Sequence, residues 1–235
     1  MLVKTNGSAV YGISAQLITV EVNVGQGAKT QIIGLPDNAV KESQPRVNAA
    51  MKNCGFTYPR KGVIINMAPA NIRKEGSAYD LTIAIGVMAA GALITSDLLD
   101  ETIIMGELSL DGSILPIKGA LPIAIQAQKD GFKRLIVPIE NAREAAIVKD
   151  VEVYGMKNLN DVVALLEGTQ KFDRTIVNPR DDFADGIQNL TYDFSDVKGQ
   201  ENIKRAMEIA AAGGHNIMLF GAPIATVLPS LLSET

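Results

Sequence analysis

The sequence is poor in the residues that build disulfides and many metal sites. It has one cysteine, Cys54, one histidine, His215, and no tryptophan. A single cysteine excludes an internal disulfide framework and is typical of a reducing compartment. A single histidine excludes a two-histidine metal site. We interpret Cys54 as a packed thiol at a helix end and His215 as a hydrogen-bonded structural residue.

Long apolar runs are also missing. The longest, Leu81 to Ile94, has about 14 residues, fewer than the roughly 18–20 that cross a bilayer. The segment from Met1 to Gly12 lacks the apolar centre of a signal peptide. We therefore expect a cytoplasmic protein without a membrane partner. The net charge of -4 gives no general attraction to nucleic acid.

What the sequence does contain is hydrophobic residues, 47% of the total, in short segments separated by glycine. Gly25 to Gly27 predicts a turn between two strands, and Asp111-Gly112 predicts a hairpin. Pro36 opens a helix that Gly55 ends, although the interior Pro45 is expected to kink it. The expected strands are 15–24, 29–35, 62–68, 103–110, 113–117, 134–138 and 151–154, and the expected helices are 36–54, 79–93, 119–129, 140–148 and 159–167. This pattern predicts an α+β or mixed α/β domain over residues 1–168.

The composition changes after residue 168. Residues 169–192 are polar, contain Pro179 and Gly186, and are predicted to be a linker. The second unit, 193–235, is expected to hold a helix over 200–212, capped by Ser195 or Asp196 and stopped by Gly213-Gly214. A short strand, 216–220, should follow and end at Gly221.

The segment YDFSDVKGQENIKRAMEIAAAGGHNIMLFGAP resembles the start of an α/β AAA+ ATPase module. In a complete module, the glycine after the strand begins the phosphate loop G-x-x-x-x-G-K-[ST], whose parts bind phosphates and Mg²⁺. Here the second glycine, lysine and hydroxyl positions hold Thr226, Val227 and Leu228, so Gly221 is expected to be a remnant of the loop. We expect this chain to bind no ATP.

The first domain resembles the N-terminal domain of the magnesium-chelatase-like ComM family. The resemblance lies in VEVNVGQGAKTQIIGLPDNAVKES, INMAPANIRKEGSAYDLTIAIG, GELSLDGSILPIKGALPIAIQA and LIVPIENARE. It implies a Lon protease-like α+β domain, with a ribosomal-protein-like β-α fold, ahead of an AAA+ motor. It also implies a hexamer that uses ATP and Mg²⁺ on branched DNA during natural transformation, with His215 near the nucleotide. The ending at 222–235 departs from the family, as a truncation, a frameshift or an annotation error would produce.

Lon-type peptidases use a serine activated by a lysine. Laid on the K-D-G-P-S-A-G motif, residues 74–80 place Ala78 at the nucleophile position. Laid on P-I-G-G-L-K-E-K, residues 116–123 place Leu121 at the lysine position. The resemblance therefore implies a catalytically inactive domain. Ser77 and Lys118 lie nearby, but we expect a helix-capping serine and a solvent-exposed lysine that point elsewhere.

The stretch from 41 to 74 is rich in basic residues. It is interpreted as a solvated face, a DNA phosphate contact or a charge-complementary contact between subunits. Three functions stay open: a noncatalytic part of a ComM-like ATPase, an ATPase whose gene product is longer, and a peptidase with relocated residues. The possible contact residues are Lys41, Arg46, Lys52, Arg60, Lys61, Arg73 and Lys74.

Overall fold

The computed structural model describes residues 1–178 and 197–220. The chain divides into two compact units, Met1–Asn178 and Pro179–Thr235. Each unit is described by itself. No helix in the described ranges is long and apolar enough to cross a membrane.

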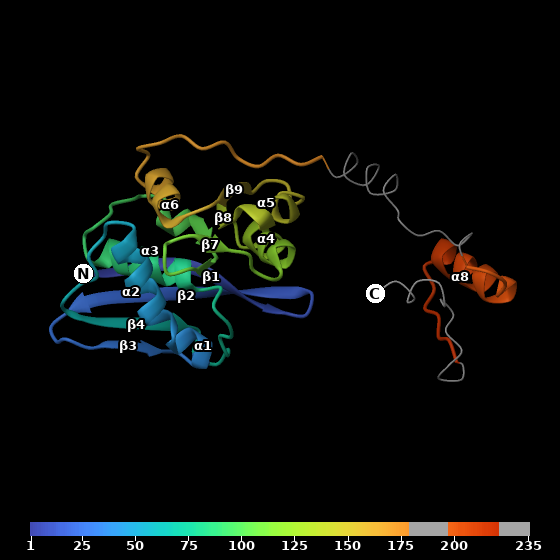
Figure 1. Cartoon of the computed structure of the whole chain (residues 1–235), viewed down its shortest axis with the longest axis horizontal. Helices are drawn as coiled ribbons and strands as arrows, with labels where there is room; N and C mark the ends of the chain where they lie inside the picture. The colour runs from blue at the N-terminus through green and yellow to red at the C-terminus, as the bar shows by residue number, and fades with distance from the viewer. Residues whose placement is uncertain (179–196, 221–235) are drawn as a thin grey trace. The chain divides into compact units, whose positions relative to one another are not determined.

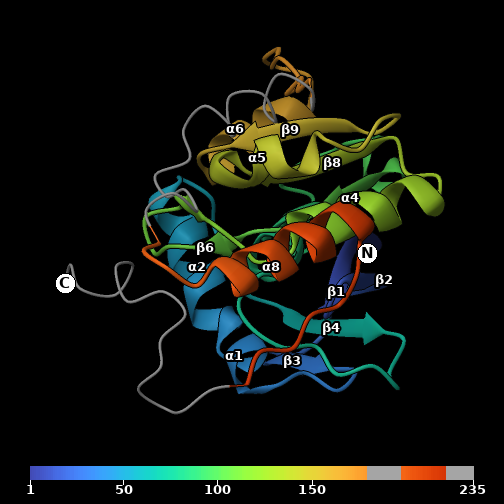
Figure 2. The same ribbon diagram turned by 90° about the vertical axis from the view of Figure 1, so that its right-hand side faces the viewer.

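The first unit is built on a mixed, seven-stranded sheet in the order β3-β4-β2-β1-β5-β8-β9. β1 is central, because it pairs antiparallel with β2 and parallel with β5. Figure 2 shows β3 and β9 at opposite ends of the sheet. The strands are β1 (Leu2–Tyr11), β2 (Ser14–Gly25), β3 (Thr30–Ile33), β4 (Gly62–Ala68), β5 (Thr102–Ile104), β8 (Arg134–Pro138) and β9 (Glu152–Met156).

Helices and a small hairpin complete the first unit (Figure 1). The hairpin consists of β6 (Glu107–Leu108) and β7 (Ile114–Leu115), which pair antiparallel. This mixture of helices and sheet agrees with the predicted α+β fold class. The helices are α1 (Asn38–Lys41), α2 (Ser43–Asn53), α3 (Asp80–Ala90), the 3-10 turn η1 (Leu99–Glu101), α4 (Ala120–Lys129), α5 (Ile139–Ala145) and α6 (Leu159–Leu166).

The helix α3 forms the centre of the hydrophobic core. All 11 of its residues are buried, so it lacks the polar stripe of a surface helix. It packs closely on the sheet at Gly86, where an added Cβ would lie 2.7 Å from Val22 Cγ2. This packing fixes the start of α3, and with it the loop that carries Ser77 and Ala78.

Several sequence-based expectations for the first unit were wrong. β1 was not predicted, although it is the central strand. β2 and β3 are not neighbours, because β4 lies between them. The helix expected over 36–54 breaks at Glu42 into α1 and α2, with Pro45 in the first turn of α2. The expected strand 103–110 divides into β5, in the main sheet, and β6, in the hairpin.

The boundary of the first unit also differs from the expected residue 168. The Thr175 N–H donates to the Val153 carbonyl at 2.8 Å, and Phe172 packs against the core. Arg174 pairs with Glu152 at 3.8 Å. Residues 169–178 of the expected linker therefore belong to the first unit, whereas residues 179–192 lie outside the described residues.

The second unit contains α8 (Glu201–Gly213), close to the expected helix 200–212. Its N-cap is Gln200 rather than Ser195 or Asp196, both of which lie outside the described residues. Gly214 ends the helix in the left-handed conformation, as predicted. The strand expected over 216–220 does not form, and its residues are exposed, since the described part of this unit offers no strand to pair with. Gly221 lies outside the described residues.

Candidate functional site: a cavity at the start of α3

A cavity of about 390 Å³ lies at the start of α3. Its wall comes from β1, the loop before α3, β6, the segment after β7 and α4. Its residues come from four parts of the sequence, 8–10, 75–79, 105–107 and 116–123. The lining residues are Ser8, Val10, Glu75, Gly76, Ser77, Ala78, Tyr79, Met105, Glu107, Pro116, Ile117, Lys118 and Ile123.

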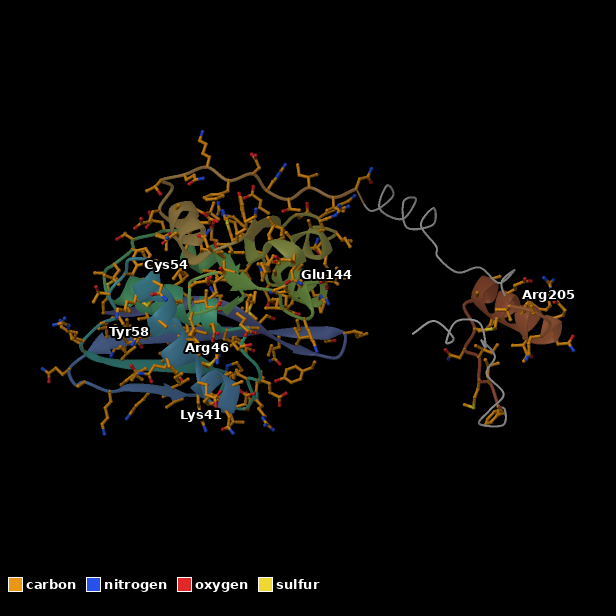
Figure 3. All side chains as sticks on the ribbon, in the orientation of Figure 1. Lys41, Arg46, Cys54, Tyr58, Glu144 and Arg205 are labelled. Carbon is orange, nitrogen blue, oxygen red and sulfur yellow. The ribbon has the colours of Figure 1, made fainter. Side chains whose placement is uncertain are left out.

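Ala78, at the nucleophile position of the Lon motif, lines this cavity. Its methyl group has no proton to give and no lone pair with which to attack a carbonyl. Leu121, at the lysine position, lies in the first turn of α4, and its side chain is likewise without acid or base. The Leu121 backbone N–H donates to Glu144 Oε1 at 2.9 Å (Glu144 is labelled in Figure 3). The two positions therefore supply no peptidase chemistry.

Ser77 and Lys118 both line the cavity, which corrects the expectation that they point elsewhere. Ser77 does not cap α3, whose N-cap is Tyr79 without a side-chain hydrogen bond. Instead the Ser77 hydroxyl donates to the Glu107 carboxylate. Lys118 is exposed, as expected. The sequence analysis missed Glu107 as a site residue, although a carboxylate directly after the buried segment Thr102–Gly106 was a usable signal.

The loop that carries Ser77 is anchored by Lys74 and Asp37. Lys74 is fully buried, and its ammonium group donates to the Gly34 carbonyl at 2.7 Å and to the Pro69 carbonyl. Burial lowers the pKa of Lys74. The Asp37 carboxylate accepts from the Val40 N–H at 2.8 Å and from the Gly76 N–H at 3.0 Å. One carboxylate thus caps α1 and holds the cavity loop.

Behind the cavity, Arg46 of α2 pairs with Asp80 of α3. The guanidinium contacts both carboxylate oxygens, at 2.8 and 3.0 Å, and the Leu108 N–H donates to the same carboxylate at 3.3 Å. Burial raises the pKa of Asp80 while Arg46 opposes that rise. The hydrogen bond to Asp80 raises the pKa of Arg46. This pair joins α2, α3 and β6 around the site.

These contacts remove two residues from the expected contact set. Lys74 cannot reach a phosphate or another subunit because it is buried, and Arg46 is committed to Asp80. Figure 3 shows Lys41, Arg46 and Cys54 following one another along α1 and α2. The five exposed members of the set are Lys41, Lys52, Arg60, Lys61 and Arg73.

The five exposed cations do not form one continuous face. Arg60 and Lys61 precede β4, and Arg73 follows it, so about 20 Å of strand separates them. Lys41 precedes α2, and Lys52 lies in the last turn of that helix. DNA contact and subunit contact stay predictions for these residues.

Cys54 is half-buried at the end of α2, and His215 is exposed directly after α8. Burial raises the pKa of the Cys54 thiol, which favours its protonated, less nucleophilic form. Its sulfur lies 3.8 Å from the Asp111 carbonyl oxygen. The backbone N–H of the exposed His215 donates to the Ala210 carbonyl at 2.8 Å. Within the described residues, no group of three or more His, Cys, Asp or Glu side chains is arranged to hold a metal ion.

Comparison of the sequence with known protein families identifies the family of this chain. The family described as "Subunit ChlI of Mg-chelatase" matches residues 20–141 of the chain. The chain belongs to this magnesium-chelatase ChlI family. A second family, "Magnesium chelatase, subunit ChlI", matches residues 193–234 of this ChlI-family chain.

Individual relatives carry the resemblance along nearly the whole chain. "Uncharacterized protein YifB" of Escherichia coli is 41% identical over 216 residues, which are 92% of this chain and 42% of that protein. "Competence protein ComM" of Haemophilus influenzae is 37% identical over 233 residues, which are 96% of this chain and 46% of that protein. These matches confirm the predicted ComM-like family. The chain spans less than half the length of these relatives.

A more distant relative supports the fold of the first unit. "Lon protease 2" of Bacillus subtilis is 28% identical over 193 residues, which are 74% of this chain and 33% of that protein. The Lon-like α+β fold class is therefore confirmed, while the residues at the two catalytic positions differ from those of the Lon motifs.

Proposed function

We propose that this chain is the noncatalytic N-terminal part of a ComM-like AAA+ ATPase, and that its Lon-like unit serves assembly of the complete protein. The observation that carries the proposal is Ala78 in the wall of the cavity at the start of α3, where the motif comparison predicts the nucleophile. A domain that serves contacts needs the fold but not the catalytic serine. Loss of the serine from a retained fold therefore favours a role in contacts over a role in cleavage. DNA processing in natural transformation is proposed for the complete protein, by analogy with the name of the ComM relative.

A cleavage assay tests the noncatalytic assignment. The full chain is incubated with an unstructured protein substrate beside its Ser77→Ala variant and a Lon-type peptidase as positive control. We expect no cleavage by either form, because Ser77 is held by Glu107 and the Lon lysine position is Leu121. Cleavage that Ser77→Ala abolishes would instead identify Ser77 as a relocated nucleophile and defeat the proposal.

The second candidate function is an ATP-driven motor on branched DNA, performed by the longer gene product. It is favoured by the family match over residues 193–234. ATP and Mg²⁺ would be cofactors of that product. For the present chain, Thr226, Val227 and Leu228 replace the phosphate-loop glycine, lysine and hydroxyl. We expect calorimetry to find no saturable ATP–Mg²⁺ binding up to about 1 mM, and a micromolar dissociation constant would favour the motor for this chain as well.

DNA contact by the first unit is the alternative to a role in assembly. Assembly is favoured because the net charge is negative and the exposed cations are dispersed over the first unit. Binding to branched and duplex DNA should be measured at two salt concentrations, with Lys41→Glu and Arg73→Glu as variants. Tight binding that weakens steeply with salt and with these substitutions would favour DNA contact. We propose a cytoplasmic location for the complete protein, as a homo-oligomer, with a hexamer as the family expectation.

A further inference from the structure

The strand β1 has a free edge beside the cavity at the start of α3. On one side β1 pairs with β2 along its whole length. On the other side it pairs with β5 only at Asn6. β5 ends at Ile104, and the next residue, Met105, donates its N–H to the Ile136 carbonyl of β8 at 3.0 Å. Within the described ranges, no strand therefore lies beside residues 8–11 of β1 on this side, where Figure 1 shows the β1–β2 hairpin reaching beyond the rest of the sheet.

The register between β1 and β2 shows which backbone groups point toward this edge. The Met1 ammonium donates to the Val24 carbonyl at 2.9 Å, and the Val24 N–H donates to the Met1 carbonyl at 3.2 Å. Bonded pairs alternate along an antiparallel ladder, so the odd-numbered residues of β1 bond to β2 and the even-numbered residues point away from it. The Ser8 N–H agrees with this direction, because its partner is the Met105 thioether sulfur at 3.2 Å.

Three backbone groups of this free edge have no hydrogen-bond partner among the described residues. They are the Ser8 carbonyl and the N–H and carbonyl groups of Val10. The Ser8 N–H has only the thioether, which is a weak acceptor. Both residues line the cavity of about 390 Å³, so the free edge is part of its wall. Residues two positions apart in a strand are separated by about 7 Å, which is also the repeat of an extended peptide.

The rest of the cavity suits a side chain of such a peptide. Its apolar wall is formed by Val10, Ala78, Met105 and Ile123, of which Met105 and Ile123 are buried. Its charged lining residues carry both signs, two carboxylates and one ammonium group. The cavity volume lies within the range of about 300–1,000 Å³ that is typical of ligand sites. One apolar side chain can therefore enter the cavity while the peptide backbone pairs with β1.

We propose that the free edge of β1 binds an extended polypeptide segment of another protein by strand addition, with one apolar side chain of the segment in the cavity. The unpaired groups of Ser8 and Val10 select an extended main chain, because a helical or folded partner has its own main-chain groups already bonded. The cavity then selects an apolar residue at one position. This inference rests on the noncatalytic assignment above, since the bound segment stays intact, and it goes beyond that assignment by naming a class of partner.

Val10→Pro in the full chain tests the edge directly. Proline removes the Val10 N–H, which points away from β2, so it blocks strand addition without removing a hydrogen bond between β1 and β2. Val10→Thr is the matched control, because threonine keeps both the N–H and the branched shape of valine. Urea unfolding of both variants checks that the first unit is folded.

The probe is a fluorescein-labelled peptide of serine and threonine with one central leucine, blocked at both ends and about nine residues long, or about 30 Å when extended. By fluorescence anisotropy we expect saturable binding to the unchanged chain with a dissociation constant of about 100 μM or tighter. Val10→Pro should weaken binding at least about tenfold, and Val10→Thr should leave it unchanged. N-methylation of the three central amide groups of the peptide, or aspartate in place of the leucine, should weaken binding to the unchanged chain by a similar factor. These two peptides keep the test independent of how well Val10→Pro folds.

Three results would overturn the proposal. One is the absence of saturable binding up to about 1 mM peptide. Another is binding that N-methylation leaves intact, which would show that the main chain is not recognised. The third is self-association of the chain that Val10→Pro abolishes and the peptide does not displace, which would assign the edge to a second copy. Mass spectrometry of the bound peptide separates this inference from the noncatalytic assignment. A peptide that binds and is then cut would defeat that assignment but support strand addition, whereas an uncut peptide that does not bind would defeat strand addition alone.

Discussion

Lys74 carries an ionisable group into the interior of the first unit, where only carbonyl oxygens receive it. Its own backbone also holds the loop, since its N–H donates to the Leu35 carbonyl at 3.2 Å and its carbonyl accepts from the Asp37 N–H at 2.9 Å. The side chain satisfies the carbonyls of Gly34 and Pro69. It therefore fixes the path of residues 69–76 toward the cavity.

Lys74→Met should destabilise the first unit by about 1–3 kcal/mol, because it leaves two buried carbonyls without a donor. The loss should also depend on pH. Burial lowers the folded-state pKa of Lys74, so the unfolded chain, with a lysine pKa of about 10.4, binds more protons in the window below that value. The stability of the unchanged chain should therefore rise relative to Lys74→Met as the pH is raised toward about 10. Urea unfolding curves across this range measure it, and parallel pH profiles would contradict it.

Asp80 depends on Arg46 in a different way, because the Asp80 side chain is fully buried while the Arg46 side chain is 23% exposed. Asp80→Ala should cost about 3–5 kcal/mol in urea unfolding, since it leaves the charge of Arg46 partly buried and unpaired. Glu75→Ala is the matched control. It breaks the exposed pair with Arg73 and should cost less than about 1 kcal/mol. If both variants lower the free energy of unfolding equally, the buried pair contributes no more to stability than the exposed pair.

At the scale of elements, the β6–β7 hairpin is seated against the end of α2. Gly112, in its turn, has a φ of +90°, and an added Cβ would lie 2.1 Å from the Cys54 sulfur. The Asn53 side chain donates to the Leu110 carbonyl at 2.7 Å across the same junction. This turn is therefore restricted both by its backbone conformation and by its neighbour.

Gly112→Ala should lower the free energy of unfolding by more than about 2 kcal/mol, through left-handed strain and the clash with Cys54. Cys54→Ala in the same chain should recover the part caused by the clash and leave about 1 kcal/mol of backbone strain. Chemical denaturation of the two variants and of Cys54→Ala alone completes the comparison. If Cys54→Ala recovers nothing, the sulfur does not restrict the turn.

The contrast between β4 and β1 shows how far the sequence predicts this fold. The predicted bounds of β4 agree with the structure, because its apolar residues lie between Lys61 and Pro69. β1 was missed because its buried centre, Thr5 to Ala9, is small and largely polar. Several of its polar groups have distant partners, such as the Thr82 carbonyl that accepts from the Thr5 hydroxyl at 3.1 Å and the Leu99 carbonyl that accepts from the Asn6 amide at 3.3 Å. The local sequence therefore lacks the apolar pattern that predicts a strand.

The candidate site was predicted in part for the same reason. The two altered catalytic positions, Ala78 and Leu121, follow from local motifs. Ser77 and Lys118 share a cavity with Glu107. This proximity depends on tertiary contacts between the start of α3, β6 and the segment after β7, which the local sequence does not show. The burial of Lys74 depends in the same way on Gly34 and Pro69, so a basic run in the sequence did not reveal which lysine is exposed.

At the scale of the whole molecule, the boundary after Asn178 predicts where the chain is cut first. Limited proteolysis should yield a resistant fragment that ends near Asn178 rather than near Gly168, because Phe172, Arg174 and Thr175 contact the first unit. Mass spectrometry of the early fragments decides between the two ends. Early cuts inside residues 1–168 would contradict the division into two units. A stable fragment ending at Gly168 would contradict the revised boundary.

The central place of β1 has a consequence for how the molecule is made. β1 is synthesised before both of its partners and can form a hairpin with β2 at once, yet its parallel partner, β5, is synthesised only around Ile103. Contacts between segments so far apart in sequence slow folding, so the pairing of β1 with β5 is expected to form late. A substitution that prevents β1 from pairing should therefore separate the β3-β4-β2 half of the sheet from the β5-β8-β9 half. The same kind of substitution in β3 or β9 should remove only an edge strand.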